Sequence, residues 1–211
     1  MNSGHRAGEV GLFAAAPAAS AGPPFHARDA TDAELMALVG RGDEQCVVEL
    51  QRRYRPMVVS YAATLLDADL AEDVAQEVFI RACAHAARWQ PIGSLRAYLL
   101  RIARNLALNE RRRAKARSFM LNAAQAVFAR RRVATPADTF DEHELKSVIV
   151  AALSNMPTRR RDAFGLVRFG GLSYAEAASV MGTSPQTVAN QVSAAMADLR
   201  RVIDPLAEGS A

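Results

Sequence analysis

The strongest chemical signal in the sequence is a concentration of positive charge between residues 96 and 117. Eight basic residues against one acid, Glu110, give this stretch a formal charge of +7, whereas the whole chain carries only +4. Guanidinium and ammonium groups neutralise phosphates, and carboxamides can hydrogen-bond base edges. We therefore predict a nucleic-acid contact, with a solvated helix face as the alternative. The polar positions away from the apolar stripe are Arg101, Arg104, Asn105, Asn109, Arg111, Arg112 and Lys115.

Two aromatic residues lie close to this basic stretch. Trp89 and Tyr98 are candidates for stacking on bases, as expected where a single strand binds. Ordinary packing in a core or hinge is an equally good interpretation for Tyr98.

A second signal is the pattern around Gly182. Ser173-Tyr174-Ala175-Glu176 has the form of a capping box, Gly182 suits a sharp turn, and Ser184-Pro185 suits the start of a helix. This is the pattern of a helix-turn-helix whose second helix enters a major groove. A helical hairpin that binds protein is the alternative. The second helix would bury Val188, Val192, Met196 and Leu199 and expose Gln186, Thr187, Asn190 and Ser193.

The elements that position these signals are predicted to be helical. Half of the residues are apolar but only 6% are aromatic, which favours helix over sheet. A capping box at Thr31 opens the first helix, and a long amphipathic helix follows with a kink or break expected at Pro56. A third helix is expected to begin at Asp69, and Ser94 caps a fourth. Further helices are expected near 142–155, 158–169, 173–181 and 185–203.

The chain is therefore predicted to be all-α, with two small helical domains joined by a flexible linker. Four helices form a first domain at 29–117, residues 118–140 form the linker, and 141–204 form a second domain. A disordered Ala/Pro/Gly-rich tail is expected at 1–28 and a short tail at 205–211.

Other function classes find no support in the sequence. We see no Gly-rich phosphate loop, no nucleophile–base pairing, and no spacing of the four His residues that would gather a metal, so neither an enzyme nor a cofactor or metal site is predicted. Cys46 and Cys83 are expected to be small apolar residues in a reducing compartment. No apolar run approaches the roughly 18 residues of a membrane span, and a cytoplasmic protein with no membrane partner is expected.

Both signals resemble parts of one family. Residues 71–81 (AEDVAQEVFIR) resemble the segment of sigma region 2.2 that docks on the β′ clamp helices of RNA polymerase. Residues 94–109 (SLRAYLLRIARNLALN) resemble regions 2.3–2.4, which engage the −10 element. Residues 153–161 and 172–200 resemble regions 4.1 and 4.2, which read the −35 element. This order, with no region 3 domain between, is that of the extracytoplasmic-function (ECF) subfamily of sigma-70 factors.

The resemblance implies a promoter-recognition subunit that works only when bound to core RNA polymerase, at its β′ clamp helices and β flap, and that opens promoter DNA. Many relatives are also held by an anti-sigma factor. The implied polymerase contacts are Asp73, Gln76 and Glu77, for which a solvated, ion-paired helix face is the alternative. The implied −10 contacts are Trp89, Arg96, Arg101, Arg104, Asn105, Asn109, Arg112 and Arg113. The implied −35 contacts are Ser184, Gln186, Thr187, Asn190 and Ser193.

The sequence departs from the family in its recognition helix and at two positions of the basic stretch. Tyr98 stands where relatives usually carry Trp, and Asn109 where they often carry Asp. Relatives also commonly place Lys or Arg at the positions of Ala189, Gln191 and Ala194. The loss of these cations removes phosphate anchors, so we predict weak or unusual −35 recognition with a shallow salt dependence.

Two rival functions fit the sequence less well than a sigma factor does. A helix-turn-helix regulator that binds operators without polymerase would need a sensor domain and a dimerisation surface, and the N-terminal helices carry the −10-type motif instead. A protein-interaction module does not explain the +7 stretch, eight basic residues minus one acid. The sigma hypothesis requires two helical modules held apart to span a promoter, and an open face at Arg101 and Arg104 rather than internal ion pairs.

Overall fold

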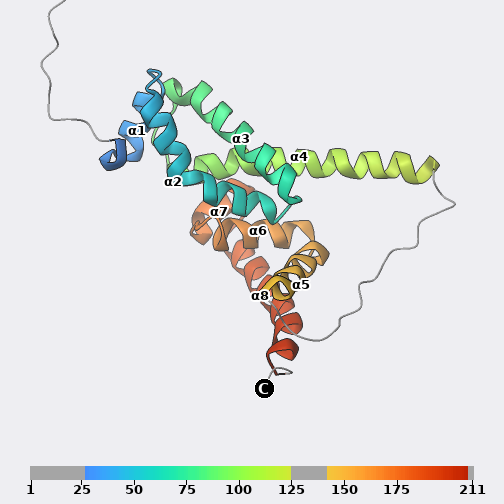
Figure 1. Cartoon of the computed structure of the whole chain (residues 1–211). Coiled ribbons are helices and arrows are strands. Elements are labelled where there is room, and N and C mark those ends of the chain that lie inside the picture. Colours follow the sequence, from blue (N-terminus) through green and yellow to red (C-terminus); the bar gives the residue numbers. More distant parts are fainter. Residues whose placement is uncertain (1–26, 125–141, 209–211) are drawn as a thin grey trace, which may run out of the picture.

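The computed structural model describes residues 27–124 and 142–208, and every regular element in them is a helix (Figure 1). The all-α prediction is confirmed. The predicted linker lies outside the described residues except for its beginning, which belongs to α4. The N-terminal helices are α1 (Asp32–Val39), α2 (Glu44–Ala63), α3 (Ala68–His85) and α4 (Leu95–Ala124). The C-terminal helices are α5 (Glu142–Asn155), α6 (Thr158–Arg168), α7 (Tyr174–Met181) and α8 (Pro185–Glu208).

Local capping signals explain where most of these helices begin. Thr31 and Glu34 form the predicted capping box of α1, with the Thr31 amide donating to Glu34 Oε2 at 2.9 Å. The predicted start of α3 at Asp69 is wrong, because the carboxylate of Asp67 accepts from the Leu70 amide and the helix begins at Ala68. The chain is also ordered before Thr31, in a single 3₁₀ turn at Ala27–Asp29.

Helix α2 continues through Pro56, so the expected break does not occur. Leu50 and Tyr54 before the proline, and Val58 and Tyr61 after it, are all buried in the same core. Proline removes one backbone hydrogen bond from a helix, whereas burial of several large side chains on both sides of it keeps both halves of α2 on the same core.

The N-terminal helices bury one face each, and α2 and α3 pack against α4. Leu35 of α1, Val78 of α3 and Leu99 of α4 have no exposed surface. In the C-terminal part, α8 lies along α5, α6 and α7, and Phe164 and Leu199 belong to a small core of their own between α5, α6 and α8.

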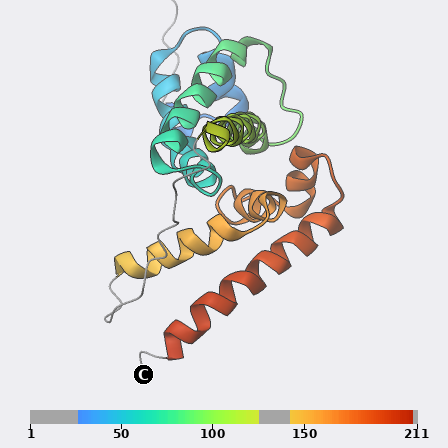
Figure 2. The same cartoon turned by 90° about the vertical axis from the view of Figure 1, so that its right-hand side faces the viewer.

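The two groups of helices pack against each other (Figure 2). Helix α6 contacts α2, and α7 contacts α4. Ala163, Leu166 and Leu172 of the C-terminal group belong to the same continuous core as the N-terminal helices. In this conformation the two modules pack against each other, whereas the prediction that they are held apart concerns the protein on polymerase and promoter DNA.

Candidate nucleic-acid interface

Helix α4 carries the basic stretch and is anchored by its apolar side. Ser94 caps it as predicted, since the Ala97 amide donates to Ser94 Oγ at 3.2 Å. Leu95, Leu99, Ala103 and Ala107 recur at a spacing of four residues and are buried. This spacing keeps one side of the helix in the core and leaves the remaining circumference to the basic and carboxamide residues.

The predicted −10 residues lie on that remaining circumference of α4. Arg104 is half-buried, and Trp89 lies half-buried just before the helix. Two of the exposed arginines have local partners: Arg112 donates to Asn109 Oδ1 at 2.8 Å, and Arg113 pairs with Glu110 at 2.6 Å. The exposed members are Arg96, Arg101, Asn105, Asn109, Arg112 and Arg113.

Trp89 and Tyr98 lie together beside the start of α4. Their ring centroids are 6.4 Å apart with the planes tilted by 59°, and burial raises the pKa of the Tyr98 hydroxyl. Both rings line a hollow of about 420 Å³ that Ile92, 87% exposed, and Arg101 also border. The rings thus pack on each other and still face open space, which combines the two interpretations that the sequence left open for Tyr98.

Arg104 is engaged in an internal ion pair. Its Nε–H donates to Asp162 Oδ2 at 2.7 Å, and the Tyr61 hydroxyl donates to Asp162 Oδ1 at 2.8 Å. Asp162 is almost fully buried. Burial of the Tyr61 hydroxyl, together with the negative charge of Asp162, raises the pKa of Tyr61 well above its ordinary value. The open face required at Arg104 is therefore absent in this conformation. Arg101 remains exposed, although its Nη2 donates to Ser179 Oγ at 3.2 Å.

Three other polar residues of α4 and its cap also contact the C-terminal helices. The Ser94 hydroxyl donates to Glu176 Oε1 at 2.6 Å, and Arg96 Nη1 lies 3.5 Å from the Gly170 carbonyl. Arg111 donates to the Leu65 carbonyl at 2.8 Å and to Thr158 Oγ1 at 3.1 Å. From Arg96 to Arg111 the basic stretch is thus joined to α6, to α7 and to the loop between them.

Sequence reasoning missed Asp162 and saw Glu176 only as a helix cap. A signal for Asp162 was present, because it precedes buried Gly165 and Leu166 by three and four residues and so lies on the buried face of α6. A carboxylate at such a position needs a partner. Spacing could not say that the partner is Arg104.

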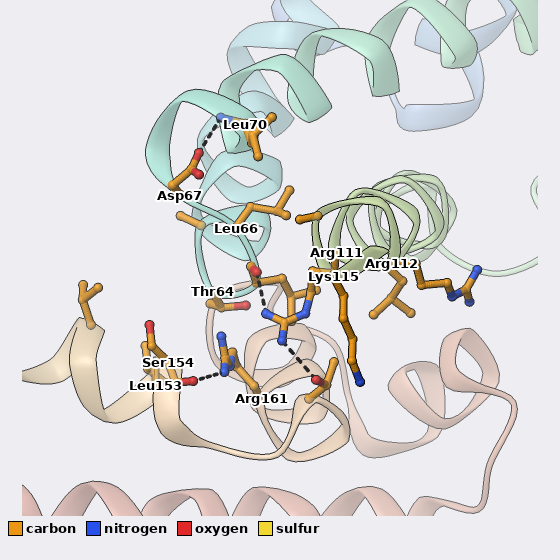
Figure 3. A pocket seen from close by; sticks show the side chains of 16 residues that line it. Thr64, Leu66, Asp67, Leu70, Arg111, Arg112, Lys115, Leu153, Ser154 and Arg161 are labelled. Carbon is orange, nitrogen blue, oxygen red and sulfur yellow. Dashed lines mark hydrogen bonds between the residues drawn. The ribbon is translucent and has the colours of Figure 1, made fainter. Parts of the chain in front are cut away.

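Beside Arg111 the two groups of helices leave a cleft of about 900 Å³ (Figure 3). Arg161 lines it and donates to the carbonyls of Ser154 and Met156 at the end of α5. Burial, with a smaller effect of nearby Arg111, lowers the pKa of Arg161 to about 10. Arg111, Arg112 and Lys115 also line the cleft, so this side of the contact is positively charged.

The helix-turn-helix has the predicted local geometry. Ser173 and Glu176 form a capping box at α7, Gly182 ends that helix in the left-handed region at φ +66°, and the Thr187 amide donates to Ser184 Oγ at 3.1 Å. Val188 and Val192 are buried. Ser184, Gln186, Thr187, Asn190 and Ser193 are all exposed, and Gln186 Nε2 donates to Asn190 Oδ1 at 3.0 Å.

The predicted polymerase contacts lie on the outer face of α3. Asp73 and Gln76 are exposed, whereas Glu77 is half-buried and pairs with Arg81 at 2.6 Å. Ile80 lies beside them and is 55% exposed.

The described residues contain no candidate metal site and no candidate membrane span. Within 27–124 and 142–208, no three His, Cys, Asp or Glu side chains come together in a way that could hold a metal ion. None of the described helices has the length and hydropathy of a membrane span.

Comparison with known proteins identifies both parts of the chain. Residues 50–117 match Sigma-70 region 2 and residues 146–199 match Sigma-70, region 4. The ECF RNA polymerase sigma factor EcfG of Rhodopseudomonas palustris is 31% identical over 70% of this chain and 80% of its own length. The sigma-H factor of Pseudomonas aeruginosa is 27% identical over 83% of this chain and 95% of its own length.

Two solved structures share the fold. CnrH in complex with the cytosolic domain of CnrY has a TM-score of 0.59 and 23% identity, covering 82% of this chain and 97% of that one. The sigma factor RpoE of Bartonella quintana, in complex with the anti-sigma factor NepR, has a TM-score of 0.56 and 23% identity, covering 74% and 96%. The chain therefore belongs to the sigma-70 family as an ECF sigma factor, a subunit that directs RNA polymerase to promoters.

Proposed function

We propose that this sigma factor, once bound to core RNA polymerase, engages the −10 element with α4 and the loop before it, and the −35 element with the start of α8. The observation that carries the proposal is the hollow bordered by Trp89, Tyr98 and Arg101, directly beside the basic face of α4. Aromatic rings can stack on an unpaired base while guanidinium groups neutralise the adjoining phosphates.

At the −10 element, each class of side chain has its own role. Trp89 receives a base from the opened non-template strand, and Asn105 and Asn109 contact base edges. The arginines contact the phosphates of the DNA backbone, because they are positively charged and are distributed over several turns of one helix. The arginines assigned to the backbone are Arg96, Arg101, Arg104, Arg112 and Arg113.

At the −35 element, recognition relies on hydrogen bonds rather than on charge. The exposed carboxamides of Gln186 and Asn190 can read adenine, and Ser184, Thr187 and Ser193 border them. Because relatives commonly have cations where this helix has Ala189, Gln191 and Ala194, we propose that −35 binding contributes less affinity here than −10 binding does.

The polymerase is held at two places in this proposal. The surface for the β′ clamp helices is formed by Asp73, Gln76 and Glu77. Ile80 extends it by about one turn of α3. The C-terminal helices meet the β flap. Because its proposed function requires polymerase and promoter DNA, the protein acts in the cytoplasm. An anti-sigma factor is a further proposed partner, because one structural neighbour, the sigma factor RpoE, was solved in complex with an anti-sigma factor.

In vitro transcription with purified core polymerase, followed by mapping of start sites, tests the proposal. We expect promoter-specific transcripts only when the sigma factor and core polymerase are both present. The Trp89→Ala and Arg112→Ala variants should lose most of these transcripts. Arg201→Ala is a matched control, because Arg201 is an exposed arginine that pairs with Asp198 on α8. Tight binding to promoter duplex without core polymerase, with no association with the core enzyme, would instead favour an operator-binding regulator.

A further inference from the structure

We infer that α6 and α7 are an internal partner of the basic face of α4, so that in the free protein the C-terminal helices occupy the −10 surface and must leave it before DNA can bind. The inference rests on the proposed function for the identity of the displaced ligand. The occupancy itself rests on contacts within the chain.

The centre of this domain contact is the triad of Tyr61, Arg104 and Asp162. The side chain of Asp162 is only 2% exposed and that of Arg104 only 19% exposed. Tyr61 and Arg104 together provide the hydrogen bonds for both carboxylate oxygens. A carboxylate so placed binds the guanidinium as a backbone phosphate would, and removing only one partner of such a pair leaves an uncompensated buried charge.

The contact extends from this centre toward the start of α4. Arg101 donates to Ser179, Ser94 donates to Glu176, and Arg96 approaches the Gly170 carbonyl. Glu176 and Ser179 also line the hollow beside Trp89 and Tyr98. The proposed base-binding hollow therefore has one wall made by α7, which narrows the approach of a DNA strand.

The packing around two glycines shows that the two groups of helices fit closely together. A Cβ atom on Gly165 of α6 would lie 2.6 Å from Thr64 Oγ1 and 3.1 Å from the Tyr61 ring. A Cβ atom on Gly170 would lie 2.6 Å from Leu100 Cδ1. The backbone at Gly165 and Gly170 approaches these side chains so closely only because neither position carries a side chain.

The contact leaves part of α4 outside it. Asn105, Asn109, Arg112 and Arg113 are exposed and make no hydrogen bond to α6, α7 or α8 among the described residues. The free protein therefore presents an incomplete −10 face. Arg104 cannot hold Asp162 and a phosphate with the same Nε–H, so DNA and the C-terminal helices compete for it.

Two substitutions separate the helices in different ways. Asp162→Asn keeps the shape of the side chain and removes the charge that Arg104 pairs with. Gly165→Ala adds one methyl group at the close approach to Thr64 and Tyr61, while alanine is the better helix former within α6. Neither residue is one of the proposed DNA contacts or part of the α3 surface proposed for the β′ clamp helices. Asp198→Asn is the matched control, because Asp198 pairs with Arg160 and Arg201 inside the C-terminal helices.

Small-angle X-ray scattering of the full chain measures opening, and fluorescence polarisation with a short labelled single-stranded oligonucleotide of mixed sequence measures access to α4. We expect the wild type and Asp198→Asn to be compact and to bind weakly. Asp162→Asn and Gly165→Ala should have larger radii of gyration and bind about tenfold more tightly, because an apparent Kd falls as the binding-competent fraction rises. Far-UV circular dichroism confirms that each variant is helical.

The two hypotheses fail in different ways. A wild type that is already extended, and as tight a binder as both variants, would overturn the inference whatever the protein does. Variants that open without binding the oligonucleotide more tightly would support the domain contact and count against α4 as the −10 surface.

Discussion

Ser94 and Glu176, 82 residues apart, are joined by a hydrogen bond of 2.6 Å from the Ser94 hydroxyl to Glu176 Oε1. Each of these residues also caps a helix. Ser94 accepts from the Ala97 amide at the start of α4, and Glu176 accepts from the amide and hydroxyl of Ser173 at the start of α7. One carboxylate therefore connects the start of the basic helix to the start of the helix-turn-helix.

The charge of Glu176 makes the stability of the protein depend on pH. The Ser94 hydroxyl, followed by Ser173, lowers the pKa of this carboxyl below its ordinary value of 4.5. A group whose pKa is lower in the folded state stabilises the fold above its unfolded pKa, and this contribution is lost as the pH falls through the folded pKa. Urea denaturation at a series of pH values should therefore give a steeper loss of unfolding free energy below pH 4.5 for the wild type than for Glu176→Gln. Parallel curves for the two proteins would contradict this.

The start of α3 can be tested with two aspartates that lie close together. Asp67→Ala removes the side chain that accepts from the Leu70 amide, and loss of such a cap costs about 1 kcal/mol of unfolding free energy. Asp69 lies in the first turn, and within the described residues no hydrogen bond involves its side chain. We expect Asp69→Ala to cost only about 0.3–1 kcal/mol through the helix dipole. Chemical denaturation of both variants gives the order, and the opposite order would restore Asp69 as the cap.

The turn of the helix-turn-helix depends on the backbone of Gly182. Its φ of +66° is in the left-handed region, and no other atom lies within 4 Å of where a Cβ would be. A substitution there strains the backbone without a steric clash, so Gly182→Ala should lower the unfolding free energy by about 1–2 kcal/mol. Gly182→Asn should cost less, because asparagine tolerates this conformation. Thermal unfolding that shows equal stability for glycine, alanine and asparagine would rule out this account of the turn.

The recognition helix offers a test by gain of function. Gln191→Arg adds a cation next to the exposed residues of α8, which should steepen the slope of log K against log salt by about 0.9. Gln191→Glu is the reciprocal control and should weaken binding. Both are measured with the holoenzyme on a promoter found by start-site mapping. An unchanged slope for Gln191→Arg would place this face of α8 away from the DNA backbone.

Local sequence signals predicted much of this fold. The capping boxes at Thr31 and Ser173 and the cap at Ser94 were identified correctly, because each depends on residues three positions apart. Asp69 was chosen wrongly for the same reason, since Asp67 stands two residues earlier and is an equally good cap. At Pro56 the local preference for a break was overridden by packing on both sides, which no short window reveals.

The domain contact was beyond such reasoning. Arg104 and Asp162 are 58 residues apart, and Tyr61 and Asp162 are 101 residues apart. Periodicity assigned Arg104 correctly to the polar side of α4, but it could not show that another helix lies over that side. The basic charge predicted a negative partner, and in this conformation part of that partner comes from the chain itself.

The close approach at Gly165 also has a genetic consequence. A selection for raised transcription from the promoters of this sigma factor should yield substitutions in α6, at positions outside the proposed DNA contacts. Such alleles would be dominant over the wild type, since they release a surface that the normal protein keeps covered. Their promoter preference would be unaltered, because the residues that read the bases would be the same.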